Sequence, residues 1–264
     1  MDPTEQVQVT RIGPIDREMF ADDVVAEAPF ELRLGDTPIA VLMRSPGHDA
    51  DLALGFALTE GIILRPAEIG AIRPLPGDDQ GDRWVLELAG GVTVDPEQFR
   101  RNLYTSSSCG VCGKASIDAV RVAAPSLPDG PVLDRNVLFS LPEKMRAYQS
   151  AFTLTGGIHA AAAFTPSGEL VALREDVGRH NAVDKLVGAL AVEAWPLPEL
   201  ILLVSGRVSF EMVQKAAVAG LPIVCGVSAA SSLAIDLGRE LGVTVVGFLR
   251  GEECNIYTGD HRIR

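Results

Sequence analysis

The chain has 264 residues, which is enough for one large domain or two ordinary ones. Hydrophobic residues make up 47% of it and charged residues 22%, a balance typical of a globular protein and not of a disordered one. The formal net charge of -12 argues against general binding to nucleic acids or anionic membranes, which favour a basic surface. A few local arginines and backbone N–H groups can still hold a small anion in a cleft.

Cellular location is predicted from two absences in the sequence. No charge-free apolar run of about 18 residues is present, so we expect no membrane span. The polar, acidic start of the chain lacks the apolar core of a signal peptide, so we expect a cytoplasmic protein. Thiols are kept reduced there, and close-spaced cysteines indicate redox, metal-binding or nucleophilic chemistry before a structural disulfide.

Residues 1–104 are predicted to form a small α+β domain with antiparallel strands. Residues 1–23 are interpreted as a polar lead-in. Alternating apolar residues predict two strands within residues 29–45, joined by a Gly-Asp turn. Helical spacing of apolar residues predicts a helix over residues 49–63, with an aspartate as its cap. A hairpin is expected over residues 84–94.

Residues 105–135 are predicted to form a mobile loop and a linker. Cys109 and Cys112 lie there in the run TSSSCGVCGK. Serine and glycine neighbours favour an exposed, mobile backbone, whereas a cysteine kept for packing normally has apolar neighbours. The Pro-, Gly- and Asp-rich residues 124–135 are the expected interdomain linker.

Residues 136–264 are predicted to form an α/β domain with a mostly parallel sheet. Its first helix is expected to start at residues 140–143, with serine as cap and proline in the first turn. A hairpin is expected through residues 166–168, and a helix within residues 175–191. Farther on, wholly apolar strands at 200–205, 222–227 and 243–249 alternate with helices at 209–219 and 229–241. Such an alternation indicates parallel strands covered on both faces.

In a parallel sheet, ligands bind beyond the carboxyl ends of the strands. The segments 205–209, 226–232 and 248–253 are expected at that edge. Helix N-termini preceded by Gly and Ser offer N–H groups to an anion, and Arg207 and Arg250 could add charge toward a phosphate. We therefore predict a phosphate-bearing ligand, such as GDP. Alternatively, Ser and Gly only cap helices and make turns, since no Walker-A or G-x-G-x-x-G spacing is present.

A polar block, Glu175-Asp176-Val177-Gly178-Arg179-His180-Asn181, precedes the helix that ends near residue 191. Its histidine could orient a ligand or transfer protons. The alternative is a capped helix start with a Glu175–Arg179 pair.

Two metal-based functions are disfavoured. His159 is followed by two alanines, where a zinc deaminase has the glutamate that shuttles protons, and the C-x-x-C precedes this histidine. A structural zinc site would combine the C-x-x-C with ligands from elsewhere: Cys225, Cys254, His159 or His180. However, Cys225 lies in an apolar strand, where a buried thiol is expected, and a second close-spaced pair is missing.

Two functions remain possible for the C-x-x-C motif: a redox pair or a sulfur carrier. Lys114 and a following helix N-terminus would favour the reactive thiolate of Cys109 or Cys112. A thioredoxin motif should end a strand and open a helix, whereas this pair lies in a Ser/Gly-rich connection. A mobile loop suits a persulfide that visits a donor and then an acceptor.

Several blocks, in one order, resemble the FdhD family over most of the chain: SSCGVCGKAS, TGGIHAAA, REDVGRHNAVDKLVG, SGRVSFEMVQKA, AGLPIV with GVSAASSLA, and GFLRGEECNIYTG. The resemblance implies a sulfurtransferase required for active formate dehydrogenase. It also implies that sulfur arrives as a persulfide from a cysteine desulfurase and passes to the molybdenum bis(molybdopterin guanine dinucleotide) cofactor. The implied C-terminal fold is cytidine-deaminase-like, and the implied assembly is a homodimer.

The resemblance assigns Cys109 as the persulfide carrier and Cys112 as its partner. It also implies cofactor binding by one segment near the C-terminus: Phe248, Leu249, Arg250, Gly251, Glu252 and Glu253. Together with the strand-end argument, Arg207, Ser228 and His180 complete the expected cofactor pocket. No resident metal is expected. Two alternative functions remain possible: a non-catalytic cofactor chaperone and a dithiol oxidoreductase.

Overall fold

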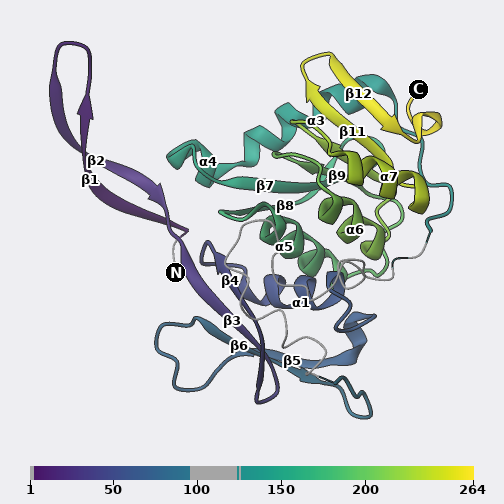
Figure 1. Cartoon of the computed structure of the whole chain (residues 1–264), viewed down its shortest axis with the longest axis horizontal. Helices are drawn as coiled ribbons and strands as arrows, with labels where there is room; N and C mark the ends of the chain where they lie inside the picture. The colour runs from purple at the N-terminus through teal and green to yellow at the C-terminus, as the bar shows by residue number, and fades with distance from the viewer. Residues whose placement is uncertain (1–2, 96–123, 125) are drawn as a thin grey trace.

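The computed structural model describes residues 3–95, 124 and 126–264, and within them three sheets with helices packed around two of the sheets (Figure 1). The C-x-x-C cysteines, Cys109 and Cys112, lie outside the described residues. No helix in the described part of the chain is long and apolar enough to cross a membrane.

The N-terminus forms a projecting β-hairpin, so the prediction of a polar lead-in is wrong. Strands β1 (Thr4–Ile12) and β2 (Arg17–Val25) pair antiparallel, and the ribbon extends away from the rest of the molecule in Figure 1. The strand signal was present as the alternation of valine with polar residues, followed by a Gly-Pro turn. Most of these side chains remain exposed, and polarity alone concealed the pattern.

A four-stranded sheet follows, in the order β4-β3-β6-β5. The predicted pair within residues 29–45 is confirmed as β3 (Ala28–Leu34) and β4 (Thr37–Arg44), which are antiparallel. The predicted hairpin over residues 84–94 is wrong. Strand β6 (Arg83–Leu88) pairs instead with β3 and with β5 (Ile69–Pro74). Strand β5 is a short edge strand containing Gly and Pro, a composition that weakens the local strand signal.

Helix α1 (Asp49–Thr59) lies between this sheet and the C-terminal part of the chain (Figure 1). One side of α1 packs on the four-stranded sheet through residues such as Leu52 and Leu58, which are buried with Phe30. The other side contacts helix α5 (Arg179–Ala191). The predicted helix over residues 49–63 is therefore confirmed, although it ends four residues earlier. The predicted aspartate cap is wrong, because the N-cap residue is His48 and no side chain caps this helix.

The six-stranded sheet has the order β12-β11-β10-β9-β7-β8. The three predicted apolar strands are confirmed and parallel: β9 (Ile201–Val204), β10 (Ile223–Gly226) and β11 (Thr244–Arg250). The other strands are β7 (His159–Phe164), β8 (Leu170–Asp176) and β12 (Glu253–Thr258), and their pairings are antiparallel. The prediction of a mostly parallel sheet is therefore corrected to a mixed sheet. Tight turns join β7 to β8 and β11 to β12, and a tight turn can only join antiparallel neighbours.

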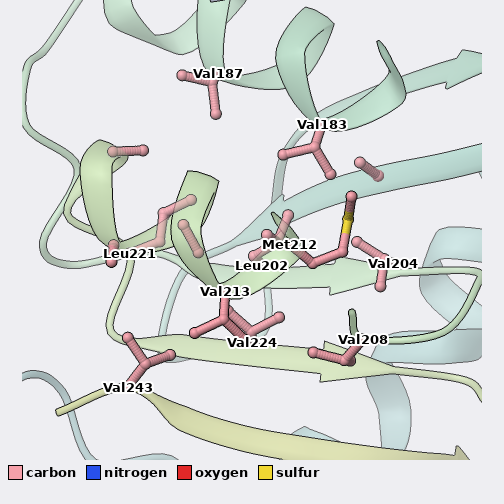
Figure 2. Close-up of a cluster of buried hydrophobic side chains, with 14 of the residues drawn as sticks. Val183, Val187, Leu202, Val204, Val208, Met212, Val213, Leu221, Val224 and Val243 are labelled. Atoms are coloured by element: carbon pink, nitrogen blue, oxygen red, sulfur yellow. The ribbon is translucent and has the colours of Figure 1, made fainter. Parts of the chain in front are cut away.

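Helices cover both faces of this sheet. One face carries α5 together with α6 (Phe210–Ala219) and α7 (Ser232–Leu241), and Figure 2 shows the valine-rich core beneath them. Strand β9 illustrates the arrangement, because Leu202 points into this core while Leu203 points into the core on the opposite face. Both faces are buried, which explains why the strands are apolar throughout.

The opposite face is covered by α3 (Arg135–Tyr148), and the short α4 (Ser150–Thr155) follows it. The predicted start of this helix at residues 140–143 is wrong. The helix begins five residues earlier, where the Asp134 side chain accepts a hydrogen bond from the Asn136 N–H at 2.7 Å. Pro142 lies inside the helix, so the serine-proline pattern was misinterpreted as its first turn.

Candidate functional site

The three segments predicted at the carboxyl edge of the parallel strands lie side by side. The Val208 N–H donates to the Ala229 carbonyl at 3.0 Å, which joins the loop after β9 to the loop after β10. The Phe248 N–H donates to the Ser228 carbonyl at 2.9 Å, which joins the end of β11 to the same loop. Backbone hydrogen bonds thus make one continuous surface from segments that are distant in sequence.

Two glycines allow these loops to approach so closely. A Cβ at Gly226 would lie 2.6 Å from the Val208 side chain, and a Cβ at Gly247 would lie 3.1 Å from the Ser228 carbonyl oxygen. Next to Gly247, Phe248 has a φ of 53° where the pairing of β11 with β12 shifts register. A non-glycine residue in the left-handed region is strained, and such strain gathers at functional sites. Phe248 as a whole residue is 41% exposed.

Charged side chains surround this surface. The Arg250 Nε donates to the Val227 carbonyl at 2.8 Å, and its guanidinium lies 6.0 Å from the centre of the Phe248 ring. Arg207 is exposed on the neighbouring loop. These two cations could hold phosphate groups, as the sequence suggested. Glu252, on the turn that follows, and Glu253, the first residue of β12, are both exposed.

The remaining residues of this segment differ in what they offer. The Leu249 side chain is fully buried in the core beneath α3, so only its backbone is available to a ligand. Gly251 has a φ of 53° and supplies the turn between β11 and β12. A binding role for the segment therefore rests on the backbone, on Phe248 and on Arg250.

His180 lies on a different element, in the first turn of α5. Its Nε2 is 2.7 Å from the Glu211 Oε2 at the start of α6, and both side chains are mostly buried. The pair connects the beginnings of two helices that reach the same end of the sheet. The sequence did not identify Glu211 as a site residue. It follows the helix cap Ser209, where an acidic residue in the first turn is ordinary because it favours the helix dipole.

The rest of the polar block holds the structure together. The Glu175 carboxylate accepts hydrogen bonds from the Ala151 and Phe152 N–H groups of α4, both at 2.9 Å, so the alternative Glu175–Arg179 pair is not formed. The Asp176 Oδ2 lies 2.7 Å from the Lys185 Nζ. It also accepts from the backbone N–H that follows β4, at 3.1 Å. These contacts fix the N-terminal sheet to the start of α5.

His159 begins β7, next to the loop that carries Arg207. A Cβ at Gly206 would lie 3.5 Å from its Nδ1. Burial lowers the pKa of His159, and its electrostatic interactions with Arg179 and with the neighbouring His180 lower that pKa further. The imidazole is therefore neutral at neutral pH in the folded protein.

We expect acidification to weaken folding partly through His159. Its pKa is lower in the folded chain than its ordinary value of 6.5, so the unfolded chain binds more protons just below that pH. Stability contributed by the neutral imidazole is present above pH 6.5 and is lost as the pH falls toward the folded pKa. His159→Gln should therefore reduce the loss of unfolding free energy between pH 7 and pH 5 in urea titrations. An unchanged pH slope would contradict this, and the exposed His261→Gln serves as control.

Metal binding gains no support from the described residues. Within residues 3–95, 124 and 126–264, no group of three or more His, Cys, Asp or Glu side chains is placed to hold a metal ion. Cys225 is fully buried in β10, as its apolar neighbours predicted, and burial raises the pKa of its thiol. It is thus a core residue and an unsuitable thiolate ligand.

A buried charge cluster was not anticipated. The Lys215 Nζ of α6 lies 2.9 Å from the Asp184 Oδ1 of α5. It also lies 2.9 Å from the Glu60 Oε1 and 2.9 Å from the Thr59 Oγ1, at the end of α1. Three helices are joined through one ammonium group. In the sequence, Asp184 and Lys215 resembled ordinary polar positions of amphipathic helices.

Comparison with known proteins identifies the family of this chain. The model of the FdhD/NarQ family matches residues 25–264. The chain is 50% identical to the sulfur carrier protein FdhD of Streptomyces avermitilis, over 98% of this chain and 95% of that protein. It is 45% identical to the sulfur carrier protein FdhD of Mycolicibacterium paratuberculosis, over the full length of both. The chain belongs to the FdhD/NarQ family.

The fold has a solved counterpart. A crystal structure of a candidate formate dehydrogenase accessory protein from Desulfotalea psychrophila matches with a TM-score of 0.80 and 25% identity, and covers all of both chains. The predicted resemblance to the FdhD family is thereby confirmed, together with a mixed α/β architecture. The cytidine-deaminase-like character of the C-terminal part stays a prediction.

Proposed function

We propose that this protein is a cytoplasmic sulfur carrier that serves formate dehydrogenase. Sulfur would arrive as a persulfide from a cysteine desulfurase and pass to the molybdenum bis(molybdopterin guanine dinucleotide) cofactor before its insertion into formate dehydrogenase. The observation that carries the proposal is the 50% identity, over nearly the whole chain, to a protein named a sulfur carrier. A homodimer is the proposed assembly.

The proposed chemistry uses the two cysteines of the C-x-x-C motif. The Cys109 thiolate attacks the outer sulfur of the donor persulfide, the donor S–S bond breaks, and the donor thiolate leaves. Cys109 then holds the sulfur as a persulfide. The Cys112 thiolate attacks the inner sulfur of that persulfide, forms a Cys109–Cys112 disulfide and releases the sulfur as hydrosulfide. The sulfane sulfur is reduced by two electrons, the cysteine pair is oxidised, and a cytosolic dithiol reductant restores the pair.

The surface at the strand ends fits the nucleotide part of such a cofactor. Arg207 and the anchored Arg250 are the cations toward its phosphates, and Ser228 lies on the loop after β10, which is hydrogen-bonded to the segments that carry both arginines. Phe248 offers an exposed ring beside Arg250. The cofactor would supply the metal that accepts the sulfur, and these residues would bind and orient it.

The proposal is tested by incubating the full-length protein with a cysteine desulfurase and cysteine, followed by intact mass and zinc measurements. We expect a thiol-reducible gain of one or more sulfur atoms without stoichiometric zinc. Cys109→Ala should lose that gain and fail to support formate dehydrogenase, while it still binds GDP. Cys112→Ala should keep the added sulfur but release it slowly. Stoichiometric zinc with no added sulfur would contradict the proposal that the protein carries sulfur.

A non-catalytic cofactor chaperone is the second candidate. The surface built from Arg207, Ser228 and Arg250 favours it, because the described contacts that shape this surface come from backbone groups and from the Arg250 side chain. A chaperone with Cys109→Ala would still bind GDP and still support formate dehydrogenase. A dithiol oxidoreductase would instead show a reversible Cys109–Cys112 disulfide within the cytosolic range of potentials and no added sulfur.

A further inference from the structure

The N-terminal hairpin has a long strand edge without a neighbour. Within the described part of the chain, β1 and β2 pair only with each other, and the ribbon projects from the rest of the molecule (Figure 1). Residues 4–24 precede the part of the chain that the family model matches, so the family assignment gives this hairpin no role. An isolated two-stranded ribbon is marginally stable in water, and an unpaired edge is a template for another strand. The hairpin therefore lacks the third strand that a stable sheet needs.

The free edge of β1 is better suited to further pairing than the free edge of β2. Helix α4 packs against β2. Charged side chains also oppose the addition of a strand, and β2 carries four of them: Arg17, Glu18, Asp22 and Asp23. Strand β1 consists mostly of valine, threonine, isoleucine and glutamine, and its charged residues are Glu5 and Arg11. A further strand is therefore expected beside β1.

Hydrogen bonds at the two ends of the hairpin show which backbone groups of β1 face outward. At the base, the Ala26 N–H donates to the Pro3 carbonyl at 2.9 Å, and at the tip the Gly13 N–H donates to the Asp16 carbonyl at 2.9 Å. The register between these ends is continuous, and bonding positions alternate along an antiparallel ladder, so the odd-numbered residues of β1 bond to β2. The N–H and C=O groups of the even-numbered residues point to the free edge: Thr4, Gln6, Gln8, Thr10 and Ile12.

We propose that β1 pairs antiparallel with β1 of a second copy of this chain, with Gln8 on the two-fold axis. In this register Thr4 lies opposite the partner's Ile12, and Gln6 lies opposite the partner's Thr10. Every outward-facing backbone group of one strand then meets such a group of the other, as a two-fold interface requires. The two hairpins become one four-stranded antiparallel sheet. This inference rests on the proposed homodimer and names the surface that forms it.

The side chains of the odd-numbered residues match in the same register. Glu5 lies opposite the partner's Arg11, and Val7 lies opposite the partner's Val9, each twice by symmetry. Opposite charges and β-branched pairs stabilise directly opposed positions of a sheet. The Arg11 Nη1 is 3.3 Å from the Glu18 Oε1 of its own hairpin, so it would stand between two carboxylates. A shift by two residues, the smallest that keeps the outward groups paired, would remove the contact between Glu5 and Arg11. The pattern of charges therefore specifies one register.

The hydrophobic tip of the hairpin gains a contact in the same arrangement. Ile12, Ile15 and Met19 are 77%, 99% and 74% exposed. Antiparallel pairing brings this tip to the base of the partner's hairpin. A Cβ at Gly157, just after α4, would lie 3.8 Å from the Val25 side chain, so α4 ends beside that base. Leu154 of α4 is 59% exposed. Apolar side chains are thus available on both sides of this second contact.

Analytical ultracentrifugation of the full-length protein measures the dissociation constant of the dimer. Gln8→Pro removes an outward-facing N–H and leaves the hydrogen bonds between β1 and β2 intact, so we expect it to weaken the dimer at least about 10-fold. Ala21→Pro is the matched control, because Ala21 lies opposite Gln8 in the hairpin and its N–H points to the other edge. The control should leave the dissociation constant unchanged. A loss as large as that of Gln8→Pro would overturn the choice of β1.

Exchanging the two charges of β1 tests the register. Glu5→Arg alone opposes arginine to arginine across the axis, and Arg11→Glu alone opposes glutamate to glutamate. Each variant should therefore dimerise at least about 10-fold more weakly than the unchanged protein. An equimolar mixture of the two variants restores both opposite-charge pairs, so its heterodimer should be within about 3-fold of the unchanged affinity. A mixture that dimerises no better than its components would contradict the register.

The outcomes separate this inference from the proposed function. If the unchanged protein is a monomer at micromolar concentrations, the homodimer and this interface both fail, and the mass measurement still decides sulfur carriage. If the protein is a dimer that none of these variants weakens, the pairing of β1 is wrong and the homodimer stands on another surface. If Gln8→Pro does not fold, the mixture of the two charge variants decides in its place.

Discussion

Replacing Lys215 with methionine is expected to lower the free energy of unfolding by about 3–5 kcal/mol. Its ammonium group is almost completely buried between Asp184 of α5 and Glu60 at the end of α1. Burial by itself would lower the pKa of Lys215, but the two carboxylates outweigh it and raise that pKa. Methionine fits the space of the side chain but leaves buried negative charge without its cation, and an uncompensated buried charge is costly.

Urea unfolding of the full-length protein measures this effect. Arg239→Met is the control, because its ion pair with Asp236 is exposed on both sides and should contribute less than about 1 kcal/mol. Adding Asp184→Asn to Lys215→Met should recover part of the lost stability, since it removes one of the stranded charges. A loss below about 1 kcal/mol for Lys215→Met would show that water reaches the cluster.

Replacing Gly188 with alanine is expected to cost at least about 3 kcal/mol, at the upper end for overpacking in a core. Helices α1 and α5 cross with their backbones in contact. A Cβ at Gly188 would lie 1.9 Å from the Asp51 carbonyl oxygen, and a Cβ at Gly55 would lie 1.8 Å from the Asp184 carbonyl oxygen. The clash is with backbone on both sides, so no side-chain rotation can relieve it. The two helices would have to separate.

Thermal and urea unfolding of Gly188→Ala and Gly90→Ala provide a matched comparison. A Cβ at Gly90 would meet nothing within 4 Å, so that substitution should change stability by less than about 0.5 kcal/mol. Gly55→Ala should resemble Gly188→Ala because the two glycines form one crossing. If Gly188→Ala were as stable as Gly90→Ala, the close crossing of α1 and α5 would be wrong.

Replacing Lys215 also tests how the candidate site is supported. Lys215 lies on α6, which follows the loop that carries Arg207, so the buried cluster fixes the helix next to the proposed phosphate surface. We therefore expect Lys215→Met to weaken GDP binding under conditions where the protein is still folded. The strand-end contacts made by Arg250 lie on another element and should be less affected.

Three features could be predicted from the sequence alone: the parallel strands β9, β10 and β11, the hairpin of β7 and β8, and the edge at which three loop segments meet. Each follows from a local signal, either a short apolar run or a turn residue at a fixed offset. The family blocks also lie in the sequence itself. The elements that the sequence missed or predicted at the wrong position have weak or misleading local signals. They are β5, the N-terminal hairpin and the start of α3 at Arg135.

The tertiary structure alone decided which polar residues are buried and what they contact. Asp184 and Lys215 are 31 residues apart, and each lies on a helix whose pattern permits an exposed side chain. Their pairing exists because α1, α5 and α6 meet at one point, and Gly55 with Gly188 permits that approach. Glu211 likewise meets His180 only through the packing of two helices. Local periodicity reports which face of an element is apolar, but the partner across a contact depends on how distant elements pack.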